Sequence, residues 1–205
     1  MKIAIIDHGM GNLRSVEKGF HKVGADGAFV TDDPAAVASA DKAVLPGDGA
    51  FDATMRSLRQ SGVDRVVLDF VASGRPFLGI CVGMQALLTS SEEGEPGVRG
   101  LDLVPGAVKR FAAGDGRKVP QIGWNSLAFS EGSPLGVGVP GPDPMAYFLH
   151  SYYCMPDSDA HVAATTEYGV VYASALQKDN IWATQFHPEK SGAVGLAILS
   201  NFARL

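Results

Sequence analysis

The 205-residue sequence predicts an α/β fold with a central, mostly parallel mixed sheet flanked by helices and with antiparallel strands added in its C-terminal half. Over the first ninety residues, short apolar runs alternate with helical patterns, which is typical of βα units on a parallel sheet. After residue 101, β-rich runs lie close together with turn residues between them, which favours antiparallel or mixed strands in the same sheet. Because 46% of the residues are hydrophobic, a substantial core is available, and we expect a single domain over residues 1–205.

The N-terminal half contains the alternating elements in order. Strands are expected at the short apolar or β-branched runs KIAII, GAFVT, KAVLPG and RPFLGI. Helices are expected at NLRSVEKGFHKVG, FDATMRSLRQSGVDRVVLDFVASG and VGMQALLTS. Each predicted helix can therefore serve as a crossover or a cover on a parallel sheet.

The C-terminal half is predicted to be mostly β. Strands are expected within LDLVPGAVKRF, MAYFLHSYYC, HVAATTEYGVVYASALQKDN and IWATQFHP, followed by a C-terminal helix at GAVGLAILSNFARL. The segment SEGSPLGVGVPGPDP is rich in glycine and proline, and too little chain follows it to build another core. We therefore expect a surface loop there and not a linker between domains.

Charge and composition exclude several classes of function. The formal net charge is −5 and the 17 lysine and arginine residues are scattered, so no basic stripe is present for nucleic acid. No apolar run approaches the roughly 18 residues that span a bilayer, and the N-terminal apolar stretch is too short for a signal peptide, so we expect a cytoplasmic protein with no membrane partner. Two cysteines make a poor disulfide framework, and no CxxC or Cys/His cluster in the sequence suggests a structural metal.

The segment GICVGMQ places Cys81 between two glycines, directly after a predicted buried strand. A buried, unreactive thiol is the ordinary alternative, because free cysteines are often core residues. The spacing is nevertheless that of a nucleophile elbow, in which side chains at positions 79 and 83 would collide with the neighbouring strand and helix. The start of a helix also favours the thiolate, and the backbone N–H of Val82 would point at an oxyanion. We therefore take Cys81 as the candidate nucleophile and Cys154 as a buried spectator.

The segment WATQFHPEKS supplies a base and an acid to orient it. His187 and Glu189 are two residues apart at the end of a predicted strand, so in extended conformation they face the same side, and Pro188 ends the strand. An incidental histidine at a solvated strand end is the ordinary alternative for an isolated His-x-Glu. A nucleophilic thiol needs a base oriented by a third group, so Cys81, His187 and Glu189 form the candidate catalytic triad.

The segment PGDGAF, residues 46–51, follows a predicted parallel strand, at the edge where open α/β sheets place their ligand crevices. Its glycines would permit backbone N–H groups to approach an anionic centre. An ordinary turn would have a similar sequence.

Taken together, these motifs resemble the class I (triad) glutamine amidotransferases and, among them, the glutaminase subunits of imidazole glycerol phosphate synthases. The general family features are GICVGMQ and QFHPE, in that order. The features of the narrower family are DHGMGNLRS, PGDGAF, KVPQIGWN, FLHSYY and QFHPEKS followed by GLAILSNF. They extend from residue 7 to residue 202, so the resemblance covers nearly the whole chain.

The resemblance implies hydrolysis of glutamine to glutamate and ammonia without a cofactor. Cys81 would attack the carboxamide and form a glutamyl thioester, His187 would transfer protons, and Glu189 would hold the imidazole. The oxyanion hole would consist of the backbone N–H groups of Val82 and of Asp48, the latter after a peptide flip that needs an adjacent glycine. The residues expected to bind glutamine are Gly49, Gln85, Ser151 and Tyr152.

The resemblance also implies a partner, a (β/α)8-barrel cyclase subunit that receives the ammonia in a heterodimer. The complex would act as a lyase in histidine biosynthesis and produce imidazole glycerol phosphate and an aminoimidazole-carboxamide ribonucleotide. Glutaminase activity is expected to be low without the occupied cyclase. Asn12, Trp124 and Lys190 match interface positions, although Trp124 alone is compatible with a core residue and Lys190 with a solvated charge.

Two residues depart from the family pattern, and two alternatives stay open. Asp48 stands where an apolar residue is usual, and we expect its side chain to point away from the site, because a carboxylate would oppose thiolate and oxyanion. His8 replaces the usual tyrosine. One alternative is a glutaminase subunit of an anthranilate, guanylate or pyridoxal phosphate synthase, which KVPQIGWN and DHGMGNLRS disfavour. The other is a non-catalytic regulatory subunit, which the intact triad disfavours.

Overall fold

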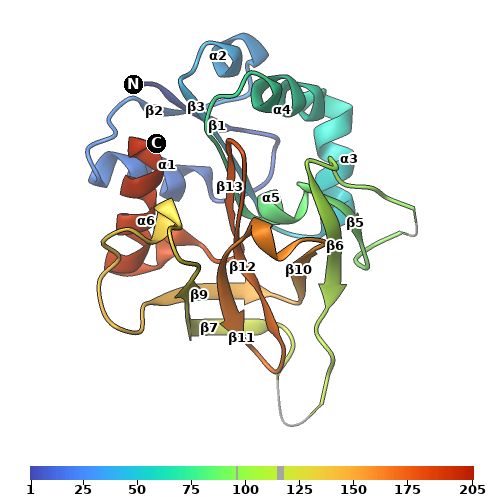
Figure 1. Cartoon of the computed structure of the whole chain (residues 1–205). Helices are drawn as coiled ribbons and strands as arrows, with labels where there is room; N and C mark the ends of the chain where they lie inside the picture. Colours follow the sequence, from blue (N-terminus) through green and yellow to red (C-terminus); the bar gives the residue numbers. More distant parts are fainter. Residues whose placement is uncertain (96, 115–117) are drawn as a thin grey trace.

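The computed structural model describes residues 1–95, 97–114 and 118–205. Within these residues an 11-stranded sheet has the order β2-β1-β3-β4-β13-β12-β10-β6-β5, with β11 and β8 joined to it through β12 (Figure 1). Its first part is parallel and consists of β2 (Ala28–Thr31), β1 (Ile3–Ile6), β3 (Lys42–Gly47), β4 (Phe77–Cys81) and β13 (Ile181–Thr184). The predicted fold class is confirmed.

Helices cover both faces of the parallel strands. One face packs against α1 (Leu13–Lys22) and α6 (Gly192–Arg204), whose Phe20 and Phe202 rings lie 6.1 Å apart. The opposite face packs against α2 (Pro34–Ala38), α3 (Phe51–Ser61) and α4 (Val63–Ala72). Strand residues alternate between these two apolar cores, as in β1, where Ile3 and Ile5 face one core and Ala4 and Ile6 face the other.

The predicted helices at residues 51–74 and 82–90 differ from the observed ones. The first is divided into α3 and α4 at Gly62, which has a φ of 73° and so ends α3 in the left-handed conformation. The second is only the single turn α5 (Val82–Gln85), and β5 (Leu88–Ser91) follows it. A short apolar run such as ALLTS is compatible with a strand as well as with a helix, and it forms a strand here because it pairs with β6.

The C-terminal strands are mainly antiparallel, as predicted. They are β6 (Val104–Arg110), β8 (Ala128–Phe129), β10 (Tyr152–Pro156), β11 (Val162–Glu167) and β12 (Val171–Lys178). However, β9 (Met145–His150) pairs with β7 (Gln121–Ser126), a strand that was not predicted, in a separate two-stranded sheet. The expectation that the predicted C-terminal strands join the central sheet is therefore wrong for β9.

The described chain also contains short helical turns and a long loop. The 3₁₀ turns are η1 (Pro134–Gly136), η2 (Asp159–His161) and η3 (Pro188–Lys190). The loop over residues 130–144 is mostly at the surface, as expected, but buries Leu135 completely. Among the residues described, no helix combines the length and hydropathy needed to cross a membrane.

Candidate active site

Cys81 is the last residue of β4 and directly precedes α5. Cys81 has a φ of 56° and a ψ of −112°, a backbone conformation that residues other than glycine rarely adopt. Strain of this kind is retained where the surrounding structure imposes it, and it is often associated with function. The sharp turn at Cys81 therefore has the backbone expected of a nucleophile elbow.

The glycines around Cys81 are required by close backbone packing. A Cβ on Gly79 would lie 2.8 Å from the carbonyl oxygen of Gly83, and a Cβ on Gly83 would overlap the carbonyl oxygen of Leu45. A Cβ on Gly47, which pairs with Cys81 across β3 and β4, would lie 2.8 Å from the Gly83 nitrogen. The expected collisions at positions 79 and 83 are therefore confirmed.

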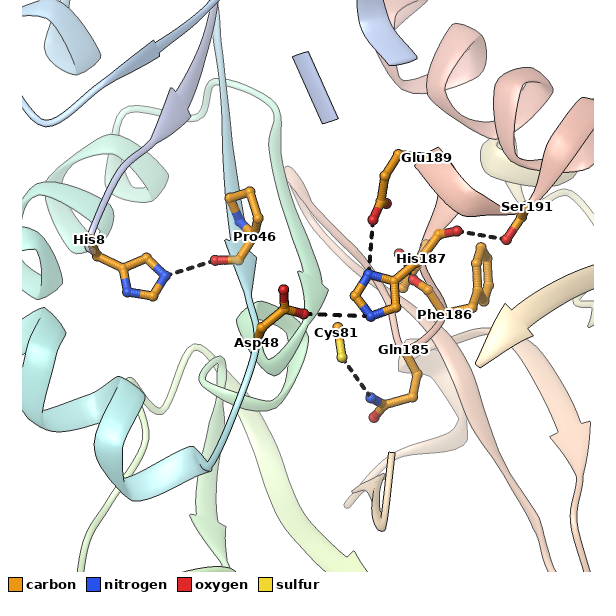
Figure 2. Close-up of polar contacts among 10 residues, drawn as sticks. His8, Pro46, Asp48, Cys81, Gln185, Phe186, His187, Glu189 and Ser191 are labelled. Atoms are coloured by element: carbon orange, nitrogen blue, oxygen red, sulfur yellow. Dashed lines mark hydrogen bonds and ion pairs between the residues drawn. The ribbon is translucent and has the colours of Figure 1, made fainter. Parts of the chain in front are cut away.

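His187 and Glu189 lie beside this elbow, with Nδ1 of His187 3.0 Å from Oε1 of Glu189 (Figure 2). Both side chains are buried, at 4% and 1% exposure. They do not meet through strand alternation, because β13 ends at Thr184 and the 3₁₀ turn η3 begins at Pro188. The η3 turn reverses the chain direction, so the Glu189 carboxylate reaches the His187 imidazole. The two side chains therefore lie on the same side, as predicted, but because of this turn and not because of strand alternation.

Asp48 also contacts this group, contrary to the expectation that its side chain points away. Its Oδ1 lies 3.7 Å from Nε2 of His187, and Figure 2 shows the carboxylate directed toward the imidazole. One atom each of Asp48, Cys81 and His187 lies within 4.8 Å of the other two. The carboxylate is 44% exposed, so water still solvates it, while the imidazole offers it a counter-charge.

The environment of His187 favours its protonated form. Burial lowers the pKa of His187, but hydrogen bonds and charge interactions with Cys81 and Glu189 outweigh burial and raise it to about 10. At neutral pH the imidazolium form therefore predominates. An imidazolium next to a cysteine stabilises a thiolate and can donate a proton to a leaving group.

The His187 segment is anchored by several hydrogen bonds. Its backbone N–H donates to the Tyr147 carbonyl over 3.1 Å, and the Ser191 hydroxyl donates to the His187 carbonyl over 2.7 Å. The Gln185 amide lies 3.9 Å from Sγ of Cys81 and accepts from the Gln85 amide over 3.2 Å. Gln185 was not predicted from the sequence, because nothing in QFHPE distinguishes it from an ordinary strand residue.

A pocket of about 300 Å³ opens beside Cys81, a volume suited to a small ligand. All four residues expected to bind glutamine line it, together with both residues expected to supply oxyanion donors. Its walls consist of Asp48, Gly49, Cys81, Val82, Gln85, Glu93, Pro120, Leu149, His150, Ser151, Tyr152 and Lys190. A cavity of about 340 Å³ bordered by residues 130–133 shares none of these residues.

Glu93 in this pocket is a second residue that the sequence analysis missed. Its carboxylate accepts a hydrogen bond from the Phe51 N–H over 2.8 Å, and burial raises its pKa. In the sequence it is one of several acidic residues in SSEEGE, and only the return of the chain after β5 places it in the pocket.

The three predicted interface residues come from three different segments of the chain. Asn12 is exposed and precedes α1, Trp124 on β7 is 54% exposed, and Lys190 borders the pocket. The alternative in which Trp124 is a core residue is therefore wrong. Its ring packs against Tyr147 of β9 with 6.1 Å between centroids.

The other two singled-out residues are buried. His8 is 4% exposed, and its Nε2 lies 2.8 Å from the carbonyl oxygen of Pro46, which links the segment after β1 to the strand that leads to Asp48 (Figure 2). Cys154 is completely buried, as predicted, and burial raises its pKa well above the usual value.

Comparisons with known proteins agree with this geometry. The sequence model of the family "Glutamine amidotransferase class-I" matches residues 4–204. Among solved structures, a glutamine amidotransferase has a TM-score of 0.74 with 17% identity, covering 99% of this chain and 100% of that one. PurLQS from Thermotoga maritima has a TM-score of 0.70 with 13% identity, covering 99% of this chain and 97% of that one. At these identities the two structures support the fold alone.

Relatives with higher identity define the family more narrowly. The chain is 54% identical to the imidazole glycerol phosphate synthase subunit HisH of Geobacter sulfurreducens, over 100% of this chain and 99% of that protein. It is 51% identical to the same subunit of Methanothermobacter thermautotrophicus, over 99% and 98%. The chain therefore belongs to the class I glutamine amidotransferases and, among them, to the HisH family of imidazole glycerol phosphate synthase subunits.

Proposed function

We propose that this chain hydrolyses glutamine to glutamate and ammonia and passes the ammonia to a cyclase subunit of imidazole glycerol phosphate synthase, in histidine biosynthesis in the cytoplasm. The observation that carries the proposal is the arrangement of Cys81, His187 and Glu189 beside one pocket. Identity of about half to HisH subunits over the full chain supports this assignment over the other synthases.

In the first half of the reaction, the Cys81 thiolate forms a bond to the carboxamide carbon, and the carbonyl oxygen becomes an oxyanion. The backbone N–H groups of Val82 and Asp48 are the proposed donors to this oxyanion. His187 then donates its proton to the amide nitrogen as the carbon–nitrogen bond breaks, which releases ammonia and leaves a glutamyl thioester.

In the second half, neutral His187 removes a proton from a water molecule that attacks the thioester carbon. The carbon–sulfur bond breaks, glutamate leaves, and the thiolate and imidazolium are restored. Glu189 contributes by holding the imidazole through Nδ1, so that Nε2 stays available for these transfers.

The pocket contains suitable groups for the amino-acid portion of glutamine. Glu93 is a carboxylate for the α-ammonium group, and Gly49, Ser151 and Tyr152 line the same space. The buried Oε1 of Gln85 has no protein partner among the described residues, so it is an acceptor for a substrate N–H group.

The sheet of β7 and β9 offers a surface for the partner. Its outer face exposes Ile122, Trp124, Met145 and Leu149 at 61%, 54%, 41% and 42%, whereas Phe148 faces inward and is completely buried. A contiguous apolar face of this kind is typical of a protein–protein contact. Because Leu149 also borders the pocket, a cyclase docked here would lie next to the source of ammonia.

The test measures ammonia release from glutamine by the purified chain, alone and with the cyclase and its nucleotide substrate. We expect strong stimulation by the occupied cyclase, loss of activity in Cys81→Ser and retention in Cys154→Ser. No release in the presence of the cyclase and nucleotide would overturn the proposal and favour a regulatory subunit. Stimulation only by another synthase would favour the alternative amidotransferases.

A further inference from the structure

Three side chains with different metal-ligating groups converge from three segments of the chain. Asp48 follows β3, Cys81 ends β4, and His187 follows β13. One carboxylate oxygen, one sulfur and one imidazole nitrogen all lie within 4.8 Å of one another. No other group of three or more such residues among those described has this spacing.

The spacing is close to that of a tetrahedral zinc site. Bonds of about 2.0–2.3 Å from Zn²⁺ to nitrogen, oxygen and sulfur place neighbouring ligand atoms about 3.3–3.7 Å apart. Nε2 of His187 and Oδ1 of Asp48 are already 3.7 Å apart. The remaining separations, at most 4.8 Å, need only side-chain movement of about 1 Å.

Glu189 completes the arrangement from behind the imidazole. Its Oε1 contacts Nδ1 of His187 over 3.0 Å, so it orients the ring and leaves Nε2 on the side of Asp48. A carboxylate in this position is a common feature of zinc-binding histidines. The adjoining pocket, of about 300 Å³ and bordered by Asp48 and Cys81, has room for water as a fourth ligand.

We propose that Asp48, Cys81 and His187 form a Zn²⁺-binding site that reversibly inhibits the enzyme. On binding, the ion displaces the Nε2 proton of His187 to solvent. It then occupies the thiolate lone pair that would attack glutamine and the Nε2 atom that would transfer protons. The ion is an inhibitor and has no role in turnover. Inhibition rests on the catalytic roles proposed above, whereas metal binding by these three side chains does not.

The direct test measures metal binding to the purified, tag-free full chain. Zn²⁺ is titrated calorimetrically, and Co²⁺ serves as a spectroscopic probe, because a thiolate ligand produces a sulfur-to-cobalt charge-transfer band. We expect one ion per chain, loss of the band in Cys81→Ser, and at least about tenfold weaker binding in Asp48→Ala, since even outer-shell partners of metal ligands contribute that much. Asp143→Ala, which removes an exposed carboxylate elsewhere, should bind as the wild type does.

Several results would overturn the site. They are absence of saturable binding at micromolar Zn²⁺, binding that Cys81→Ser leaves unchanged, and equal affinity in Asp48→Ala and wild type. In the last two cases the ion would bind elsewhere or through Cys81 and His187 alone.

The inhibition test uses the chain with its cyclase and nucleotide, with each variant compared with its own metal-free rate. We expect Zn²⁺ to abolish glutamine hydrolysis, excess chelator to restore it, and Asp48→Ala to need at least about tenfold more Zn²⁺. Binding without inhibition would refute the inhibitory role. If metal-free enzyme released no ammonia, the proposed function would fail, while the binding result would still decide the metal site.

Discussion

The Glu189 carboxylate lies 3.0 Å from Nδ1 of His187, although a proline separates the two residues and no strand joins them. Both side chains are almost fully buried, so solvent screens their interaction little. Together with Cys81, this contact raises the pKa of His187 to about 10 against the opposing effect of burial. The protonated form of His187 is therefore stabilised mainly by its interactions with Cys81 and Glu189.

Replacing Glu189 with glutamine should retain the shape of the side chain but remove its charge. The pKa of His187 should then fall from about 10 toward its ordinary value, because one of the two groups that raise it is neutral. In the proposed mechanism the imidazolium donates a proton to the amide nitrogen, which then leaves as ammonia. The alkaline limit of activity should therefore shift to lower pH, and kcat should fall by about 100-fold. The pH dependence of glutamine hydrolysis in the complex measures both effects.

The control for this prediction is Glu131→Gln, which changes an exposed carboxylate outside the pocket. It should have the wild-type pH profile. An unchanged profile and kcat in Glu189→Gln would show that Glu189 does not act on His187.

Gly83→Ala should destabilise the elbow. The added Cβ would overlap the Leu45 carbonyl oxygen, which belongs to the central strand β3 and cannot retreat without distorting the sheet. We expect a loss of about 3 kcal/mol in the free energy of unfolding, with a corresponding loss of activity. Gly24→Ala is the matched control, because the added Cβ would meet no atom within 4 Å. Only its φ of 81° is unfavourable for alanine, which should lower the free energy of unfolding by about 1 kcal/mol. Equal losses in chemical denaturation would contradict the packing argument.

His150 should make the folded state sensitive to acid. Burial, aided by the charge on His187, lowers the pKa of His150 to about 4 despite its hydrogen bond to the Tyr152 carbonyl. Between pH 6.5 and 4 the unfolded chain therefore binds a proton that the folded chain does not, so stability falls as the pH falls, by about 1.4 kcal/mol per unit from this residue. His150→Gln should remove this contribution in urea unfolding measured across that range. A slope identical to that of the wild type would exclude His150 as its source.

Trp124→Ala should weaken partner binding without destabilising the chain. The side chain is 54% exposed, so its truncation should change the free energy of unfolding by only about 0.5 kcal/mol. An exposed tryptophan on an interface commonly contributes strongly to affinity, and we expect the Kd for the cyclase to rise at least about tenfold. Val137→Ala, at a 67% exposed position in the loop over residues 130–144, is the control and should leave the Kd unchanged. Calorimetric titration of the cyclase measures both, and equal Kd values would place the partner elsewhere.

The sequence by itself determined the parallel βα framework, the elbow and the identity of the candidate triad. These features are visible in the pattern of residues that are neighbours in the chain. At the elbow, for example, a Cβ on Gly79 would meet the carbonyl oxygen of Gly83, only four residues away. The strand-forming runs of the parallel part of the sheet were equally clear, because their apolar side chains must be buried whichever strands they meet. By contrast, β5 was predicted as a helix and β7 was not predicted. The break at Gly62 was not predicted, because an isolated glycine within a helical pattern is often tolerated.

Only the tertiary structure decided that Glu93 borders the pocket and that the Asp48 and Gln185 side chains lie beside His187 and Cys81. Asp48 turns toward His187, and Glu93 and Gln185 approach from segments far apart in the sequence. Pairing between distant strands brings them together, and it also separates β7 and β9 from the central sheet. Local sequence spacing carries no information about such long-range pairing. The direction of the Asp48 carboxylate likewise depends on the imidazolium of His187, which is distant in the sequence and 3.7 Å away in the structure.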